Sequence, residues 1–248
     1  MDFDLVIQGP LNSTSLEYVD KVSSQFNKVI ISHWSENDIS LLDVIKSKNV
    51  EIYDQKTPDL NDTVGVLKDS TFFYSISSTF LGLQKCTSEY VIKMRSDERY
   101  ENFDILKEKV LEHKDRFVFG NIFAKPWSHS KYHIGDHIFG CNKELLLLGY
   151  NILYDLYYTR KLSVSDNTWC KQGGKADATA ENILALSFLK AKNVDIGIWD
   201  SIDTFKNNFD IVDIQGLGDY IVTWVGGHKS WSKGKKPFVW PVKTMENF

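Results

Sequence analysis

A short apolar stretch that runs directly into charged residues is the strongest chemical signal in the sequence. Residues 90–94 have the composition of a buried strand. Four polar residues follow it directly: Arg95, Ser96, Asp97 and Glu98. Ligands of open α/β sheets bind just beyond the carboxyl ends of strands, and Mn²⁺ and Mg²⁺ prefer oxygen ligands. Asp97 and Glu98 are therefore predicted to hold a divalent metal against a diphosphate, with a solvated loop of surface ion pairs as the alternative.

Two other predicted strands end in residues that suit a nucleotide site. After the first, glycine would allow a flat ligand to approach and proline would stiffen the exit, although glycine and proline also mark plain turns. After the second, a histidine and a tryptophan could contact a base or simply pack. The predicted nucleotide-binding residues at the strand ends are Gln8, Gly9, Pro10, His33, Trp34, Arg95 and Ser96.

Two further carboxylates could act on an acceptor hydroxyl. Glu181 falls in the first turn of a helix predicted to begin at Thr179, where the helix dipole favours the ionised form. It could take a proton from a hydroxyl, with Asp177 as the competitor for this role, but acids in first turns are also common capping residues. Asp136 lies between an aromatic loop and an apolar segment and could bind acceptor hydroxyls.

The C-terminal segment combines a histidine with several lysines. His228 follows two glycines and could supply one imidazole ligand to a metal, and Lys229 could meet a diphosphate. Three more lysines follow Trp231 in the sequence: Lys233, Lys235 and Lys236. The segment could close as a lid, contact anionic lipid headgroups, or be a solvated basic tail.

Neither cysteine nor histidine spacing predicts a zinc site. The three cysteines are widely spaced and form no Cys-x-x-Cys pair, which favours reduced thiols in a cytosolic protein. His129, His133 and His137 recur every four residues, but Gly135 and β-branched neighbours argue against the single helix that such a stripe requires.

Length and composition limit the class of protein. The 248 residues, 42% apolar and 25% charged, fit one large domain or two small ones with room for a core. The net charge of −4 argues against nucleic acid as a partner. No signal peptide is evident, and no apolar run approaches the roughly 20 residues of a membrane span. We expect a cytoplasmic protein that could also contact the inner face of the membrane through its basic tail.

The elements that must position these residues alternate in type. Strands predicted at 5–7, 29–31, 50–53 and 90–94 are separated by helices predicted at 18–26, 39–48 and 70–85. This pattern predicts an α/β fold, a mostly parallel sheet with helices on its faces. The second half is mixed, with strands at 116–119, 137–140 and 196–199, a loop at 165–178 and a helix at 179–191. Residues 1–225 are predicted as one domain, with a nucleotide half (1–100) and an acceptor half (101–225), and 226–248 as an irregular tail or lid.

Several blocks of the sequence resemble the WavE-like lipopolysaccharide-synthesis glycosyltransferases. The first strand ends Val-Ile-Gln-Gly-Pro at residue 10 and the second ends Ile-Ser-His-Trp at residue 34. A third block runs from Gly82 to the Arg-Ser-Asp at 95–97. The segments 135–140 and 180–182 are looser matches, so the resemblance spans about residues 3 to 190.

This resemblance implies a GT-A-type fold that moves a sugar from a nucleotide sugar to a glycan or glycolipid acceptor. Arg95-Ser96-Asp97 occupies the frame of the family's Asp-X-Asp metal motif, Glu181 matches the catalytic acid, and His228 matches a C-terminal metal-binding histidine. Arg95 replaces the first aspartate, so metal binding could be weaker, use Glu98, or be absent. Two alternatives are a sugar nucleotidyltransferase, which would need a glycine-rich basic loop that residues 8–12 lack, and an inactive carbohydrate-binding protein of the same fold.

Overall fold

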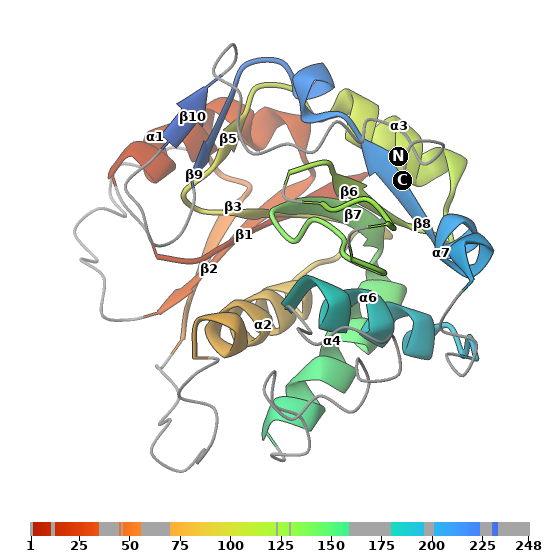
Figure 1. Cartoon of the computed structure of the whole chain (residues 1–248). Helices are drawn as coiled ribbons and strands as arrows, with labels where there is room; N and C mark the ends of the chain where they lie inside the picture. The colour runs from red at the N-terminus through yellow and green to blue at the C-terminus, as the bar shows by residue number, and fades with distance from the viewer. Residues whose placement is uncertain are drawn as a thin grey trace.

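A central seven-stranded sheet organises the protein (Figure 1). The computed structural model describes residues 2–10, 13–34, 45, 47–55, 70–122, 124–128, 130–158, 180–195, 201–223 and 230–232. In spatial order the strands are β3 (Val50–Gln55), β2 (Lys28–Trp34), β1 (Phe3–Gln8), β4 (Tyr90–Arg95), β7 (Ile138–Asn142), β6 (Phe117–Gly120) and β8 (Phe209–Val212). A small second sheet has the order β10 (Ser230–Ser232), β9 (Tyr220–Thr223) and β5 (Arg99–Tyr100).

The sheet is parallel except around β7. The pairs β3–β2, β2–β1, β1–β4 and β6–β8 are parallel, whereas β7 runs antiparallel to both β4 and β6. Strands β1, β2 and β4 are apolar at successive positions because both faces of the sheet are covered. The start of β7 consequently lies beside the carboxyl end of β4, with Met94 opposite Ile138.

Helices cover the two faces of the sheet as separate layers (Figure 1). One face carries α1 (Ser13–Val22), continued by a 3-10 turn (Ser23–Gln25), and α3 (Asp104–Glu112). The other carries α2 (Ser70–Leu83), α4 (Lys143–Tyr158) and α6 (Ala180–Ala191), which pack on one another. Near the end of the chain, α7 (Ile202–Asn208) is capped by the Ser201 hydroxyl, which accepts from the Thr204 amide at 3.2 Å, and a 3-10 turn spans Ile214–Leu217.

The predicted α/β class, with a mostly parallel sheet between helices, is confirmed, and most predicted strands and helices are present. The strands predicted at 5–7, 29–31, 50–53 and 90–94 are longer in the structure, whereas the helix predicted at 70–85 ends at Leu83 and the helix predicted at 18–26 lies at Ser13–Val22. The elements α3, α7, β8 and β9 were not predicted, because they are only nine, seven, four and four residues long and show little periodicity. The prediction that the tail is irregular is wrong for Ser230–Ser232, which form a strand that pairs with β9. Most of the predicted helix at 39–48, and all of the loop at 165–178, Thr179 and the strand at 196–199, lie outside the described residues. Among the described helices, none has the length and apolarity needed to cross a membrane.

Candidate functional site

The strand order reverses direction between β1 and β4, and the candidate site lies at this reversal. From β1 the chain adds β2 and β3 on one side, whereas β4 is placed on the other side. The carboxyl ends of β1 and β4 are therefore neighbours, with Gln8 opposite Arg95. In open α/β sheets a crevice forms at such a point, and ligands bind there.

Direct hydrogen bonds join the exits of the two strands. The Ser96 amide donates to the Gln8 carbonyl at 2.9 Å, and the Ser96 hydroxyl donates to the Pro10 carbonyl at 2.6 Å. Gly9 between them has a φ of +123°, and a Cβ there would lie 2.7 Å from the Ser96 Oγ. The sequence Gln-Gly-Pro thus holds two loops together, which fixes the backbone at the edge of the crevice.

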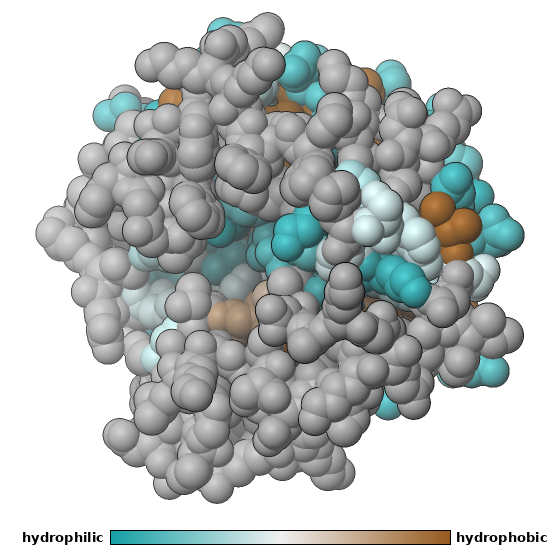
Figure 2. All heavy atoms as spheres, in the orientation of Figure 1, coloured by the Kyte–Doolittle hydropathy of each residue, from teal (hydrophilic) through white to brown (hydrophobic). Residues whose placement is uncertain are grey.

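This face of the molecule is hollowed between the sheet and the layer of α2, α4 and α6, and hydrophilic residues are visible inside the hollow (Figure 2). Two of the predicted nucleotide-binding side chains lie on the α2 side of the sheet. Gln8 accepts a hydrogen bond from the Ser75 hydroxyl at 3.1 Å, and Trp34 packs edge to face on Tyr74 with 5.4 Å between ring centroids. Trp34 is half-buried, so its ring combines packing with an exposed part.

Arg95 and Asp97 form a bidentate ion pair at the end of β4. The guanidinium Nε and NH2 donate to the two carboxylate oxygens of Asp97 at 2.9 and 2.6 Å. Burial alone would lower the pKa of Arg95, but the hydrogen bond to Asp97 and the nearby charge of Glu98 outweigh it and raise the pKa. Arg95 therefore stays charged, and Asp97 is held by it.

Glu98 lies fully inside the protein and connects two side chains from other elements. One carboxylate oxygen accepts a hydrogen bond from the Tyr100 hydroxyl at 2.8 Å, and the other contacts the His137 Nδ1. His137 directly precedes β7, and its Nε2 lies 3.7 Å from a carboxylate oxygen of Asp136. The antiparallel pairing of β4 with β7 thus brings Asp136 and His137 to the exit of β4.

The segment that carries Asp136 and His137 is fitted tightly against β6. A Cβ on Gly135 would lie 2.4 Å from the Gly120 carbonyl oxygen and 2.8 Å from that of Ile122. Only glycine allows these backbones to approach so closely. For Asp136, burial would raise the pKa, but the charges of His137, Lys93 and Arg95 outweigh it, so the pKa lies below its ordinary value and Asp136 is ionised at neutral pH.

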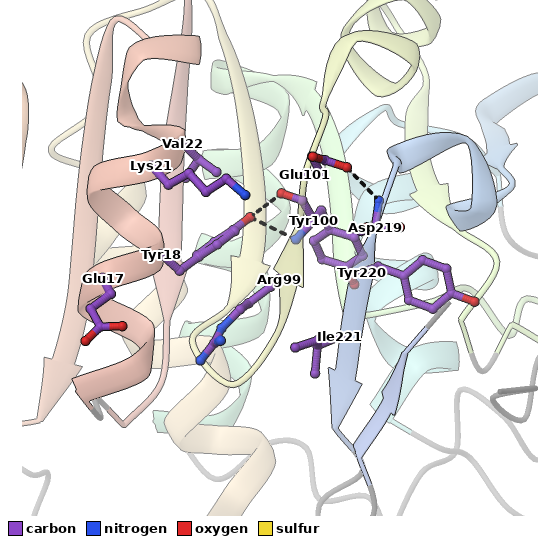
Figure 3. Close-up of a pocket in the computed structure, with 10 residues that line it drawn as sticks. All are labelled: Glu17, Tyr18, Lys21, Val22, Arg99, Tyr100, Glu101, Asp219, Tyr220 and Ile221. Atoms are coloured by element: carbon purple, nitrogen blue, oxygen red, sulfur yellow. Dashed lines mark hydrogen bonds between the residues drawn. The ribbon is translucent and has the colours of Figure 1, made fainter. Parts of the chain in front are cut away.

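Tyr100, which holds Glu98, is itself fixed by Tyr18 of α1. The Tyr18 hydroxyl donates to the Tyr100 carbonyl at 2.7 Å and accepts from the Tyr100 amide at 2.9 Å (Figure 3). Both side chains line a pocket of about 640 Å³ between α1 and the β5–β9 pair, on the opposite side from α2. Lys21 and Arg99 extend from the walls of this pocket (Figure 3).

Lys93 places an ammonium group between β4 and the helices. Its side chain is 1% exposed, and Nζ donates to the Asp136 backbone carbonyl at 2.7 Å and lies 5.2 Å from the Phe139 ring centroid. Burial lowers the pKa of Lys93 to about 8, although the charge of Asp136 acts in the opposite direction. The hydrogen bond from Lys93 thus fixes the backbone of the segment that precedes β7.

Glu181 lies in the first turn of α6, as predicted. Its Oε2 is 3.8 Å from the Nε2 of His133, which is buried. Burial lowers the pKa of His133 to about 4, so the imidazole is neutral and does not form an ion pair at neutral pH. The neighbouring Asn182 donates to the Lys131 carbonyl at 2.6 Å. The start of α6 is therefore joined to the same segment that continues to Asp136.

The structure brings most predicted residues together but not all. The residues gathered at the exits of β1 and β4 are Gln8, Gly9, Pro10, Arg95, Ser96, Asp97, Glu98 and Asp136. His33 is 1% exposed on the face opposite to α2, since the adjacent Ser32 donates to the Ser78 carbonyl of α2 at 2.6 Å. It is thus separated from Trp34. His228 and Lys229 lie outside the described residues.

Three residues that the sequence did not assign take part in the site: Lys93, Tyr100 and His137. The sequence did contain a signal that could have identified Lys93 as a site residue, since a lysine inside an otherwise apolar strand must find buried partners. No sequence signal predicts the contact of His137 with Glu98, because these residues lie 39 positions apart.

The residues at the crevice can bind anionic oxygen and can hold or move protons. Among the described residues, no group of three or more histidine, cysteine, aspartate or glutamate side chains is arranged to hold a metal ion. Asp97 is paired with Arg95, and Glu98 is buried against Tyr100 and His137. At the exit of β4, Asp136 and His137 present one carboxylate oxygen and one imidazole nitrogen 3.7 Å apart.

Comparisons with known proteins find similarity of structure only. No family model matches the chain, and no curated protein matches it. One similar solved structure is 4-diphosphocytidyl-2C-methyl-D-erythritol synthase from Anaerococcus prevotii, at 14% identity and a TM-score of 0.45, covering 77% of this chain and 99% of that one. Another is HddC from Yersinia pseudotuberculosis complexed with GMP-PN, at 11% identity and a TM-score of 0.39, covering 59% and 79%.

Proposed function

We propose that this protein is a glycosyltransferase of the GT-A type that moves a sugar from a nucleotide sugar to a glycan or glycolipid acceptor. The synthesis of lipopolysaccharide, capsule or another surface polysaccharide is the proposed setting, in the cytoplasm and at the inner face of the membrane. The observation that carries the proposal is the crevice at the exits of β1 and β4, where Gln8, Arg95 and Asp136 gather.

The donor would lie across the exits of β1 and β4. Gln8 to Pro10 and Ser96 offer backbone and small polar groups to a nucleoside, and the Trp34 ring offers a stacking surface. Arg95, together with Lys229 from the C-terminal segment, would meet the diphosphate. A bound Mn²⁺ or Mg²⁺ would offset the charge of the leaving diphosphate. The sequence suggests Asp97, Glu98 and His228 as its ligands, but in the structure Asp97 pairs with Arg95 and Glu98 contacts Tyr100 and His137.

The acceptor hydroxyl would be activated by a carboxylate. Glu181 is the proposed general base of an inverting transfer, and Asp136 is proposed to bind acceptor hydroxyls. Glu181 suits this role because the helix dipole favours its charge and the buried His133 beside it is neutral.

Two other functions would use the same crevice. A sugar nucleotidyltransferase would bind a triphosphate there, but the exit of β1, Gln8-Gly9-Pro10, carries no basic residue to hold one. An inactive carbohydrate-binding protein would retain the fold without turnover. The replacement of the first aspartate of the Asp-X-Asp motif by Arg95, which pairs with Asp97, favours this candidate over the nucleotidyltransferase.

A thermal-shift screen of nucleotide sugars, with and without Mn²⁺, tests the donor site. A donor that binds the folded state raises the unfolding temperature in proportion to its occupancy. We expect a shift with one UDP-, GDP- or CDP-sugar and slow hydrolysis of that donor in the absence of acceptor. Binding without hydrolysis or transfer would point to a sugar-binding protein, and release of pyrophosphate from a nucleoside triphosphate and a sugar phosphate would point to a nucleotidyltransferase.

Glu181→Gln tests the catalytic base. Loss of a general base should lower donor turnover by about 10²- to 10⁴-fold while the thermal shift caused by the donor is retained. Glu108→Gln, on the exposed side of α3, is the matched control and should leave turnover unchanged. Undiminished turnover in Glu181→Gln would exclude Glu181 as the base.

A further inference from the structure

The two carboxylates that the sequence assigns to a metal are already engaged by protein groups. Both oxygens of Asp97 accept from Arg95, at 2.9 and 2.6 Å. Glu98 is fully buried, with one oxygen on the Tyr100 hydroxyl and the other on the His137 Nδ1. A metal at the fully buried Glu98 would have to displace its partners, at a cost in free energy for each broken hydrogen bond, and a metal at Asp97 would compete with the charge of Arg95.

The contact with Glu98 gives His137 the orientation of a metal ligand. A carboxylate only accepts, so Nδ1 is the donor in this contact, and a metal would bind the other ring nitrogen, Nε2. Histidines that bind metals commonly donate their other ring N–H to a carboxylate in this way, which fixes the tautomer and the ring position. Here Nε2 lies on the side of Asp136, 3.7 Å from a carboxylate oxygen.

We propose that Asp136 and His137, rather than the ligands Asp97, Glu98 and His228 suggested by the sequence, are the protein ligands of a divalent metal ion. Glu98 and Tyr100 would then position His137, and Asp136 would bind the metal instead of acceptor hydroxyls. This rests on the proposed function in one respect, since the diphosphate of the donor, with water, would complete the coordination. Sites of this kind commonly use one or two protein ligands together with substrate phosphates.

The distance between the two donor atoms agrees with this assignment. Two ligand atoms, each about 2.1 Å from an ion and separated by angles of 90° to 120°, lie roughly 3.0–3.6 Å apart. The observed separation of 3.7 Å lies just above that range, so the two donor atoms would have to move slightly closer to bind one ion.

The surrounding charges and supports also favour a cation at this position. Three carboxylates (Asp97, Glu98 and Asp136) face two cations (Lys93 and Arg95) around His137. The support behind the ligand pair is rigid, because Gly135 is fitted against β6 and Lys93 holds the Asp136 carbonyl at 2.7 Å. Mn²⁺ prefers oxygen ligands such as Asp136 and the diphosphate, and the imidazole, which suits zinc better, would serve as one ligand among them.

Titration of the protein with Mn²⁺ alone, followed by electron paramagnetic resonance of the free ion, tests the site without a donor or turnover. Asp136→Asn and His137→Gln should each weaken Mn²⁺ binding by at least about 10-fold, because each removes one ligand. Asp97→Asn should retain binding. His113→Gln is the matched control, since His113 pairs with Asp210 beyond the opposite end of β6 and should bind Mn²⁺ like the wild type.

Tyr100→Phe tests the positioning of His137. This variant keeps the ring but removes the hydroxyl that holds Glu98, and second-layer changes of this kind weaken metal binding by about 10- to 100-fold. Its thermal unfolding, recorded beside that of His113→Gln, verifies that the variant is folded.

Three outcomes would overturn the metal site. They are a wild type that binds no Mn²⁺, loss of binding in Asp97→Asn with retention in Asp136→Asn and His137→Gln, or equal binding in all variants. The test is separate from the proposed function. A wild type that binds no Mn²⁺ but hydrolyses a nucleotide sugar would overturn the metal site and leave the glycosyltransferase proposal standing. Mn²⁺ binding without any nucleotide-sugar binding would support the metal site and contradict the glycosyltransferase proposal.

Discussion

Lys93 illustrates how single residues shape this protein. It is a charged side chain in the middle of a buried strand, and its amine is satisfied by one backbone carbonyl and by the face of Phe139. Burying a cation costs free energy that such partners offset only in part. The lysine therefore serves to position the backbone at Asp136, whose carbonyl accepts its hydrogen bond, rather than to stabilise the folded protein.

A dependence of stability on pH follows from Lys93. Its pKa is about 8 in the folded protein against an ordinary value of 10.5. Between these values the unfolded chain binds more protons at this residue than the folded protein does, so raising the pH favours the folded state. The free energy of unfolding of the wild type relative to Lys93→Met should therefore rise by about 2–3 kcal/mol from pH 8 to pH 10.

Urea unfolding at pH 7, 8, 9 and 10 measures this difference. Lys114→Met changes an exposed lysine on the same protein and should run parallel to the wild type at every pH. If the Lys93→Met curve is also parallel to the wild type, Lys93 does not titrate in the way its burial requires.

At the scale of elements, the site depends on the junction between the exits of β1 and β4. Three features join them: the strand pairing, the two hydrogen bonds of Ser96, and the positive φ of Gly9. No side chain of the junction needs to contact the ligand for it to matter. It sets the separation of the loops that carry the predicted nucleotide-binding residues.

Gly9→Ala should loosen this junction. A Cβ would both strain the backbone at φ +123° and lie 2.7 Å from the Ser96 hydroxyl, so we expect a loss of about 1–3 kcal/mol in the free energy of unfolding. Urea denaturation measures it, with Gly216→Ala as the control, where the nearest atom to a Cβ would be the terminal Cδ1 of Ile105 at 3.0 Å. A Gly9→Ala protein as stable as the control would show that the junction tolerates a side chain.

The elements were predictable from the sequence where their apolar pattern was continuous. The strands around Leu5, Ile30 and Ile92 are such cases, and their order of appearance with helices implied the parallel sheet. The position of β7 in the sheet and its antiparallel direction were not predictable, because they depend on which strands it pairs with. The contact of Glu98 with His137 depends on that pairing, so the sequence could assign Glu98 only by its neighbours.

At the scale of the whole molecule, the sheet separates two apolar cores and leaves its carboxyl edge for polar residues. The proposed acceptor could be a glycolipid, and the basic C-terminal segment would then meet the membrane. Each lysine near an anionic surface contributes about 1 kcal/mol. The combined variant Lys233→Gln, Lys235→Gln and Lys236→Gln should therefore weaken binding to vesicles with anionic lipid by about 100-fold.

Vesicle co-sedimentation measures this, with neutral vesicles as the baseline. A control with the same change in net charge replaces Lys85, Lys114 and Lys206 by glutamine, which lie on the described surface. Equal losses in the two triple variants would indicate a general effect of charge and would contradict a contact through the tail.

The pairing of β1 with β4 also has a consequence for the order of folding. Gln8 pairs with Ser32 across 24 positions but with Arg95 across 87. Closing the longer loop costs more chain entropy and is slower, so β1–β2 pairing should precede β1–β4 pairing during refolding. The crevice would then be assembled late, after most of the N-terminal chain has condensed, and early intermediates would be unable to bind the proposed nucleotide-sugar donor.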